Sequence, residues 1–495
     1  MISSDMFKIL GSDGGAVADT NFEIKGISID SRNVADNYCF IALEGTHSDG
    51  HDFIPAAVEK GARVIVCKKG RALRRDYPGK KVCFIEVDSP REAAGIIADA
   101  FFGSPGKKIK IIGITGTNGK TTVSYLIKHI FERQRMSSGL IGTIQYVIAD
   151  HIIPAKNTTP DAVTLHNLLR LMVEHDLGYA VMEVSSHALA QCRVSGIGFA
   201  TAVFTNLTHD HLDYHHDKEE YFAAKSRLFV SLSPAQAAVI NFDDDYGIRL
   251  KSMTAADITG YGIKNPAAAV RAQNIVLEPR GTRFTIVTPN GIQEVRTALI
   301  GRHNVYNILA AVSVGLREGL SLKSMAEALE TMDSVPGRLE KIKSLREFSV
   351  YIDYAHTDDA LKNVLTALRE LKPRRIITVF GCGGDRDKTK RPLMGKVACE
   401  NSDILVITND NPRSENPERI IEDILAGLFP GFSAYEVIPD REKAIDWALR
   451  QAQAHDFVLI AGKGHETYQI FKDKTVFFDD RKAVRDLLQE AGDTI

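Results

Sequence analysis

The chain has 495 residues, enough for about three domains of ordinary size. Its formal net charge of −2 provides no large basic field, which argues against a nucleic-acid-binding or membrane-surface protein. A hydrophobic fraction of 44% and a charged fraction of 25% are typical of soluble globular domains, each with a core of its own.

The six cysteines are scattered, and several lie inside apolar runs, which indicates reduced core thiols rather than a disulfide framework. No run reaches the roughly 20 apolar residues that a membrane span requires. The first residues also lack the charged start and apolar stretch of a signal peptide. We therefore expect a cytoplasmic protein that has neither nucleic acid nor a membrane as a partner.

Short β-branched runs alternate with amphipathic helical patterns along the chain, which predicts an α/β fold. In the first region, a helical segment through Phe101 and Phe102 follows four strand-like runs, at 24–29, 40–43, 63–67 and 82–87. A stretch rich in Gly, Pro and Lys at 103–108 predicts a linker, so the first domain is expected to span 1–104.

The second region begins with a buried-strand run at 110–115, and further strands are predicted at 179–184 and 202–207. A helix follows the first of these strands, because its apolar residues recur at i, i+3, i+4, i+7 and i+8: Val123, Leu126, Ile127, Ile130 and Phe131. A turn-like segment at 335–340 marks the expected end of the domain 105–335.

The third region, 336–495, alternates again between strands and helices. In each segment the apolar run gives way to residues such as Gly, Asp, Asn or His, the segments being 348–356, 375–385, 403–410 and 457–466. Ligands of an open parallel sheet bind beyond the carboxyl ends of its strands, so we expect a site at these run ends.

The segment GITGTNGKTT at 113–122 lies between the predicted strand and helix of the second region. A strand, a glycine loop and a helix N-terminus form a phosphate cradle, in which Lys120 would reach the phosphates and the Thr121 hydroxyl would bind Mg²⁺. Five residues rather than four separate Gly113 from Gly119. We interpret the segment as a relative of the P-loop whose glycines are Gly113, Gly116 and Gly119, and the alternative is a glycine turn that precedes a lysine.

The segment THDHLDYHHD at 208–217 holds four histidines and three aspartates, which suggests a metal. Zinc would require several His or Cys ligands, but the cysteines lie elsewhere. Thr121, Glu183 and bound phosphates supply the oxygen ligands that Mg²⁺ prefers, so Mg²⁺ is favoured. One histidine could bind a second ion, and His209 and His216 are interpreted as surface or helix-capping residues.

Several segments together resemble the Mur ligases, ATP-dependent enzymes that form amide bonds in peptidoglycan precursor synthesis. They are GTNGKTT, EVSSH, TNLTHDHLDYH, YFAAKSRLF, GRHNVYNILAA, VPGRLE and DYAHTDDAL, and they cover nearly the whole chain in the family's order. The resemblance implies three domains: a UDP-binding α/β domain, a central P-loop ATPase-like domain with a parallel sheet, and a Rossmann-like C-terminal domain that binds an amino acid.

The resemblance also implies that Lys225 is carbamylated, which would convert a cationic amine into an oxygen donor, and that His211 binds a second Mg²⁺. The implied metal ligands are then Thr121, Glu183, His211 and Lys225, and the catalytic residues are Lys120, Lys225, His211 and Glu183. The implied ATP contacts are Gly116, Thr117, Asn118, Gly119, Lys120, Thr121, Thr122, Asn304, Arg338 and Asp353.

Two further sets of contacts follow from the resemblance. Those to a UDP-linked sugar and dipeptide are Ser31, Thr46, His47, Asn157, Thr158, Thr159, Ser185, Gln191 and Arg193. The DNPR segment at 410–413 resembles that of members that add meso-diaminopimelate, and the implied contacts to this amino acid are Arg391, Asp410, Asn411, Pro412, Arg413, Gly462 and Glu466. The planar fork of Arg413 suits a distal carboxylate and would repel the lone ammonium of lysine.

The expected enzyme is a monomeric ligase that uses ATP and Mg²⁺ to join meso-diaminopimelate to UDP-N-acetylmuramoyl-L-alanyl-D-glutamate through an acyl phosphate. An L-lysine-adding Mur ligase is the nearest alternative, and a folylpolyglutamate synthetase is a more distant one. Outside the enzymes, a nucleotide-switch binding protein and a zinc-binding scaffold remain as alternatives.

Overall fold

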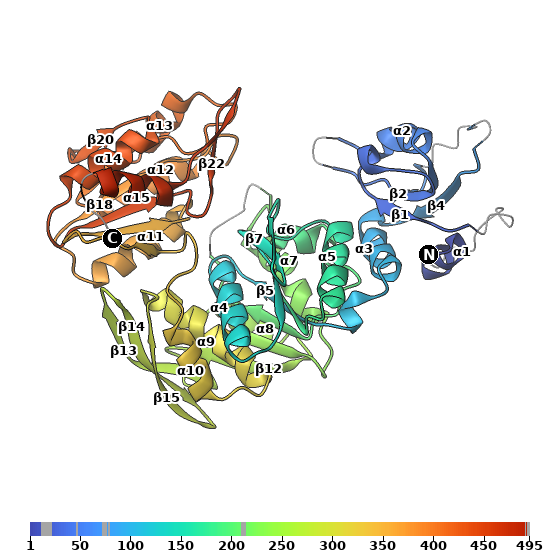
Figure 1. Cartoon of the computed structure of the whole chain (residues 1–495), viewed down its shortest axis with the longest axis horizontal. Coiled ribbons are helices and arrows are strands. Elements are labelled where there is room, and N and C mark those ends of the chain that lie inside the picture. The colour runs from blue at the N-terminus through green and yellow to red at the C-terminus, as the bar shows by residue number, and fades with distance from the viewer. Residues whose placement is uncertain are drawn as a thin grey trace.

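The computed structural model describes residues 1–10, 22–45, 48–71, 77, 80–208, 214–490 and 492. The chain forms three lobes that follow one another in sequence: blue, then cyan to yellow, then orange to red in Figure 1. Each lobe has a sheet with helices packed on it. The predicted three-domain α/β architecture is confirmed, whereas the exact boundaries at 104/105 and 335/336 stay predictions. None of the helices in the described ranges is long and apolar enough to span a membrane.

The N-terminal lobe contains a four-stranded parallel sheet in the order β1-β2-β3-β4. Its strands correspond to the four runs predicted from the sequence, and the predicted helix that follows them is α3. The elements are α1 (Ser3–Ile9), β1 (Gly26–Ser28), η1 (Ser31–Asn33), β2 (Tyr38–Ile41), η2 (Gly50–Phe53), α2 (Ile54–Glu59), β3 (Ala62–Lys68), β4 (Cys83–Val87) and α3 (Pro90–Phe101).

The central lobe contains an eleven-stranded sheet in the order β15-β14-β13-β12-β11-β10-β5-β9-β6-β7-β8. Its interior from β13 to β6 is parallel, as predicted, but antiparallel strands that the sequence analysis did not identify extend both edges. The strands are β5 (Lys110–Thr115), β6 (Ser138–Ile141), β7 (Gln145–Ile148), β8 (His151–Pro154), β9 (Tyr179–Glu183), β10 (Thr201–Phe204), β11 (Ala237–Asn241), β12 (Asp257–Gly262), β13 (Val270–Glu278), β14 (Gly281–Thr288) and β15 (Gly291–Thr297).

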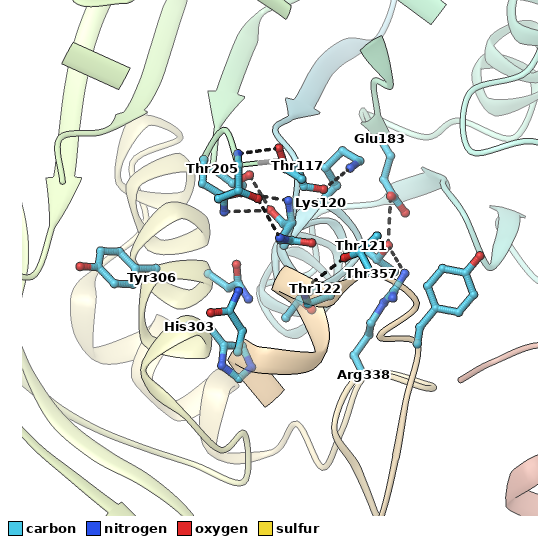
Figure 2. Close-up of a pocket in the computed structure, with 18 of the residues that line it drawn as sticks. Thr117, Lys120, Thr121, Thr122, Glu183, Thr205, His303, Tyr306, Arg338 and Thr357 are labelled. Carbon is cyan, nitrogen blue, oxygen red and sulfur yellow. Dashed lines mark hydrogen bonds between the residues drawn. The ribbon is translucent and has the colours of Figure 1, made fainter. Parts of the chain in front are cut away.

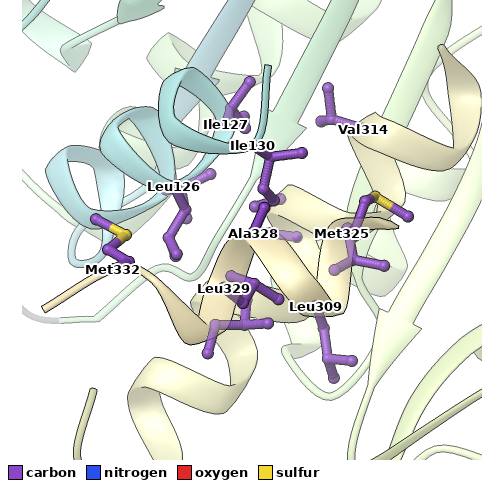
Figure 3. Packing of buried hydrophobic residues seen from close by; sticks show 14 of the residues in the cluster. Leu126, Ile127, Ile130, Leu309, Val314, Met325, Ala328, Leu329 and Met332 are labelled. Atoms are coloured by element: carbon purple, nitrogen blue, oxygen red, sulfur yellow. The ribbon is translucent and has the colours of Figure 1, made fainter. Parts of the chain in front are cut away.

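Helices cover both faces of this sheet. They are η3 (Pro105–Lys107), α4 (Lys120–Arg133), α5 (Ala162–Glu174), α6 (Ser186–Ala190), α7 (Lys218–Val230), α8 (Asp245–Lys251), α9 (Arg302–Arg317) and α10 (Leu322–Glu330). The apolar face predicted for α4 is confirmed, since all five of its residues are fully buried. Figure 3 shows three of them, Leu126, Ile127 and Ile130, packed against α9 and α10. This core fixes the N-terminus of α4 beside the carboxyl end of β5.

The C-terminal lobe contains a six-stranded sheet in the order β16-β17-β21-β18-β19-β20, in which only β16 is antiparallel to its neighbour. The four predicted runs form β17, β18, β19 and β21, so their carboxyl ends meet at one edge. The elements are β16 (Glu340–Ile342), β17 (Ser349–Asp353), α11 (Asp358–Glu370), β18 (Ile376–Phe380), α12 (Lys390–Asn401), β19 (Ile404–Ile407), α13 (Pro417–Leu425), β20 (Tyr435–Val437), α14 (Arg441–Gln451), β21 (Phe457–Ala461), β22 (Tyr468–Ile470), β23 (Thr475–Phe477) and α15 (Asp480–Glu490).

Candidate active site

The glycine loop between β5 and α4 requires two of its glycines for steric reasons. Gly116 has φ 148°, and a Cβ there would lie 1.9 Å from Thr205 Oγ1. Gly119 has φ 90°, and its Cβ would lie 2.4 Å from Asn307 Oδ1. Because α4 begins at Lys120, the free backbone N–H groups of its first turn follow this loop directly, as a phosphate cradle requires.

Gly113 has a different role from the one expected. It lies inside β5, where a Cβ would come within 2.6 Å of the Phe199 ring. The missing side chain at this position allows the Phe199 ring to pack closely on β5. Gly113 therefore belongs to the strand and not to the phosphate loop.

A cavity of about 550 Å³ adjoins this loop. Its described lining comes from the central lobe and from the start of the C-terminal lobe, and Figure 2 shows its central residues. The ammonium of Lys120 donates to the carbonyl oxygens of Gly116 (3.0 Å) and Thr117 (2.7 Å), so it lies folded over the loop. A cation held there is placed to meet an anionic ligand of the loop.

The carboxylate of Glu183, fully buried at the end of β9, accepts several hydrogen bonds at one wall of this cavity. The Thr121 hydroxyl donates to Glu183 Oε2 (3.0 Å), and Arg338 Nη2 donates to the Thr121 hydroxyl oxygen (3.1 Å). In Figure 2, Thr121 accordingly lies between Glu183 and Arg338. Thr143 also donates to Glu183, from its amide and from its hydroxyl (both 2.9 Å). Thr143 was not predicted, because one threonine in a turn forms no recognisable motif.

The donor atoms in this wall suit a hard cation. In the described part of the chain, no three His, Cys, Asp or Glu residues cluster as a metal site. The Thr121 hydroxyl and the Glu183 carboxylate are instead oxygen ligands of the kind that Mg²⁺ binds together with phosphate oxygens. Lys225 is buried nearby, where its ammonium donates to the Gly116 carbonyl oxygen (2.8 Å) and lies 4.3 Å from the centre of the Tyr221 ring.

Two histidines of the segment 208–217 lie outside the described residues, His209 and the predicted metal ligand His211. His216 is exposed, and its backbone N–H donates to Glu220 (2.8 Å) at the start of α7, which agrees with its interpretation as a surface residue near a helix end. His215 is buried beside the rings of His187 and Tyr221.

The opposite wall of the cavity is formed by the first turns of α9. Asn304 donates to the Ile300 carbonyl oxygen (2.8 Å) and accepts from Asn307 (3.0 Å), so the two amides are held in one orientation. Burial lowers the pKa of the neighbouring His303 to about 4, which keeps its imidazole neutral at pH 7. This wall is therefore polar but uncharged, which suits a nucleobase or a ribose.

Asp353 links the segment just before β16 to the segment just after β17, at the start of the C-terminal lobe. Its carboxylate accepts the backbone N–H groups of Leu339 (2.6 Å) and Ala355 (2.7 Å). Burial raises the pKa of this carboxyl to about 6, in opposition to Arg338, which lowers it. Asp353 thus shapes the cavity edge through backbone contacts, while the Arg338 guanidinium lies 4.5 Å from the centre of the Tyr354 ring.

Most of the residues predicted to contact a dipeptide form a connected network beside Glu183. Thr158 shares a hydroxyl contact with Thr143 (3.1 Å), and Thr159 donates to the Glu183 carbonyl oxygen (2.8 Å). The Ser185 amide donates to the Thr159 hydroxyl oxygen (3.0 Å).

The same network continues through Arg193, which donates to the Thr159 carbonyl oxygen (2.8 Å) and to the Gln191 side chain (2.8 Å). Asn157 is exposed, and its carbonyl oxygen accepts from the Tyr146 hydroxyl (2.7 Å). Ser31 lies apart from this network in the N-terminal lobe, at the start of η1. Thr46 and His47 lie outside the described residues.

A second cavity, of about 510 Å³, opens at the carboxyl ends of the strands of the C-terminal lobe. Among the predicted residues, its lining includes Asp410, Asn411 and Arg413 after β19, and Gly462 and Glu466 after β21. Pro412 is absent from the described lining, and its carbonyl packs against Gly384, where a Cβ would come within 1.9 Å of it.

The structure does not place Arg391 at this cavity, contrary to expectation. Its guanidinium is 1% exposed and donates to Glu415 (2.8 and 3.1 Å) and Asp423 (2.8 Å). These internal carboxylates occupy the donors that a substrate carboxylate would need. Arg386, five residues earlier, is exposed and borders the cavity instead. Two arginines five residues apart in a sequence do not show which of them faces the cavity.

Comparison with protein families assigns three consecutive segments of the chain. They match the Mur ligase family catalytic domain (residues 23–102), the Mur ligase middle domain (114–315) and the Mur ligase glutamate ligase domain (337–464).

Curated relatives match nearly the whole chain. A protein of Geobacillus thermodenitrificans named UDP-N-acetylmuramoyl-L-alanyl-D-glutamate–2,6-diaminopimelate ligase is 45% identical over 476 residues, which are 95% of this chain and 96% of the relative. A protein of Clostridium acetobutylicum with the same name, numbered 1, is 44% identical over 95% of this chain and 96% of its own length.

Solved structures agree with this similarity. A structure of a UDP-N-acetylmuramoyl-L-alanyl-D-glutamate–2,6-diaminopimelate ligase has a TM-score of 0.70 and 32% identity, and covers 99% of both chains. A folylpolyglutamate synthase of Mycobacterium tuberculosis shares the fold alone, with a TM-score of 0.63 and 18% identity over 80% of this chain and 95% of its own.

Proposed function

The chain belongs to the Mur ligase family, and from this premise we propose that it joins meso-diaminopimelate to the D-glutamyl side-chain carboxylate of UDP-N-acetylmuramoyl-L-alanyl-D-glutamate at the expense of ATP. Relatives that carry this activity in their names are 43–45% identical to nearly the whole chain. The observation that carries the choice of amine is Arg413, whose guanidinium borders the second cavity at the end of β19.

The reaction has two chemical steps. An oxygen of the glutamyl carboxylate attacks the γ-phosphorus of ATP, the bond to ADP breaks, and an acyl phosphate forms. The amine of diaminopimelate then attacks the acyl carbon, loses a proton, and phosphate leaves as the amide forms. The protein contributes mainly position and charge, since phosphoryl transfer requires little covalent participation of side chains.

We assign the phosphates of ATP to the loop 116–122. The backbone N–H groups at the start of α4 would bind phosphate oxygens, and the Lys120 ammonium would turn from the loop carbonyls towards the transferred group. Asn304 and Asn307 would contact the nucleoside at the opposite wall. This assignment is supported because the phosphate loop and the wall that contains Asn304 and Asn307 line the same cavity.

We further propose that Thr121 and Glu183, together with His211 and a carbamate on Lys225, hold Mg²⁺. The ion would supply positive charge that neutralises the phosphate oxygens during transfer. The oxygen donors of Thr121 and Glu183 and the burial of Lys225 beside the Gly116 carbonyl support this assignment.

The dipeptide would extend along the network formed by Thr158, Thr159, Ser185 and Arg193. This network shares Thr143 and Glu183 with the wall of the cavity beside the phosphate loop, which we call the nucleotide cavity. A glutamyl carboxylate at that position would therefore lie beside the phosphate loop, as attack on ATP requires.

The amine would bind in the second cavity with its distal carboxylate on Arg413. Arg413 donates to the Gly384 carbonyl oxygen (2.7 Å) and forms no ion pair with any residue of the described chain, so its charge is available to a ligand. Arg386 borders the same cavity and would take a second carboxylate. Lysine lacks the distal carboxylate, so these arginines favour diaminopimelate.

Phosphate release from ATP in the presence of the UDP-dipeptide tests this proposal, with meso-diaminopimelate and L-lysine compared as amines. We expect turnover that depends on diaminopimelate and whose kcat/KM for that amine falls about 100-fold in Arg413→Ala. Turnover with lysine in its place would contradict the choice of amine. Turnover that needs no amine, or nucleotide binding without turnover, would contradict the ligase reaction itself.

A further inference from the structure

A fully buried lysine, Lys463, lies beneath the second cavity. It follows β21 and comes directly after Gly462, which borders the cavity. Its ammonium donates to Glu466 Oε2 (3.0 Å) and to Asn411 Oδ1 (3.2 Å). A buried ammonium is stable only when such partners compensate for the loss of water, so this lysine has a defined position.

Lys463 joins the two loops that carry the cavity's polar residues. Asn411 belongs to the loop after β19 and Glu466 to the loop after β21. Asn411 Oδ1 accepts from Lys463 and from the Ile470 amide (3.0 Å), while Asn411 Nδ2 donates to Glu466 Oε2 (2.9 Å). The Asn411 side chain is therefore largely used for internal contacts.

The contacts of Glu466 have an electrostatic consequence. Both hydrogen bonds to its carboxylate, from Lys463 and Asn411, go to Oε2, and Oε1 accepts none from the described residues. Glu466 can thus still meet a ligand through Oε1, but its negative charge is balanced by Lys463 at 3.0 Å. Next to this pair, the buried Arg441 and Asp480 balance each other (2.7 Å).

We propose that Lys463 is a positioning residue that sets the amine selectivity of the ligase by balancing the charge of Glu466. The inference rests on the proposed function and refines it. The distal end of meso-diaminopimelate carries both a carboxylate and an ammonium, whereas the distal end of L-lysine carries an ammonium alone. A charge-balanced Glu466 accepts the zwitterionic end, and an unbalanced Glu466 favours the cation.

The selectivity of Lys463→Met tests the proposal. The quantity to measure is kcat/KM for meso-diaminopimelate divided by kcat/KM for L-lysine. We expect this ratio to fall on the order of tenfold through the KM values of the two amines, while KM for ATP stays constant, because one uncompensated negative charge is added near the distal group. A ratio equal to that of the wild type, with kcat reduced for both amines alike, would show a structural role only and overturn the proposal.

A second variant restores the charge balance. Lys463→Met combined with Glu466→Gln removes both charges, so we expect its selectivity ratio to lie within about threefold of the wild type even where both rates are lower. Glu466→Gln alone leaves Lys463 unbalanced and should raise the ratio. If Lys463→Met does not fold, the double variant is compared with Glu466→Gln, and equal ratios in these two would overturn the proposal.

The exposed Lys396, on α12, offers a matched control. Lys396→Met removes the same group from the same lobe and should leave the ratio unchanged. A wild-type enzyme without diaminopimelate-dependent turnover would refute the proposed function, whereas turnover with an unaltered ratio in Lys463→Met would refute this inference alone.

Discussion

The two cavities differ in how many charged side chains line them. Seven of the nineteen described residues that line the second cavity carry a formal charge, against five of the 31 that line the nucleotide cavity. The nucleotide cavity instead uses hydroxyls, amides and a helix N-terminus. A phosphate site built largely from backbone depends on few side chains, whereas a site that recognises an amino acid by charged side chains changes its specificity with each of them.

The largest effect is expected from the main cation of the phosphate loop. Lys120→Met should lower turnover by about 10³, because no second lysine of the loop can neutralise the transferred phosphoryl group. Steady-state phosphate release measures the loss. Lys128→Met, on the same helix and paired with Glu132, should stay within about twofold of the wild type. A Lys120 variant that retains a tenth of the activity would contradict the assignment of the loop.

Asp353, which lines the nucleotide cavity, should make the free energy of unfolding depend on pH. Burial raises the pKa of Asp353 from the ordinary 3.8 to about 6, so the folded state holds this proton more tightly than the unfolded state. The resulting stabilisation is complete below pH 3.8 and is lost as the pH rises through 6.

Comparison with Asp353→Asn isolates this contribution. The free energy of unfolding of the wild type should fall relative to that of the variant by roughly 2 kcal/mol between pH 4 and 6.5, as measured by denaturant titration. A difference that does not change with pH would show that the buried carboxyl keeps its ordinary pKa.

A substitution of Lys225 tests whether this residue carries a carbamate at the nucleotide cavity. Lys225→Gln should lower turnover by about 100-fold, because the replacement provides no anionic oxygen for the metal. Wild-type protein kept free of carbon dioxide should lose activity and regain it with bicarbonate. The exposed Lys218, on the same helix α7, supplies the control Lys218→Gln. Full activity without carbon dioxide would exclude the modification.

The smallest effect distinguishes Arg386, which borders the second cavity, from Arg391, which does not. Arg386→Met should raise KM for diaminopimelate about tenfold without lowering the melting temperature, because Arg386 is exposed at the cavity. Arg391→Met should instead lower the melting temperature, since Arg391 holds the pKa of Glu415 down at about 2, and its loss removes the ion pair of Asp423 and leaves Glu415 paired with Lys388 alone. The reverse result would indicate that Arg391, and not Arg386, contacts the amino-acid substrate.

Contiguous segments were the predictable part of the molecule. The strand 110–115, the glycine loop and the apolar face of α4 follow one another in sequence, and their local patterns predicted this part of the fold and led to the proposed phosphate site. The four apolar runs of the C-terminal lobe likewise became the strands that carry the second cavity.

Features that depend on tertiary packing could not be predicted from the sequence. Gly113 and Gly116 look alike in the motif, but one faces Phe199 in the sheet and the other Thr205 in the loop. Arg386 and Arg391 are five residues apart, and only the partners of Arg391 on α13 and before it show which is internal. Thr143 and the edge strands β7, β8, β14 and β15 have no motif, and their positions follow from pairing with distant segments.

Three residues at the start of the C-terminal lobe, Tyr354, His356 and Thr357, line both cavities. An inhibitor that joins a phosphate mimic to an α-amino acid across Tyr354 would occupy both sites, and its second half would bind at a high effective concentration. Under the proposed function, substitutions of Tyr354 that weaken such a compound would also alter a wall shared by the two substrate sites. Resistance at this position would therefore carry a direct cost to the enzyme's own reaction.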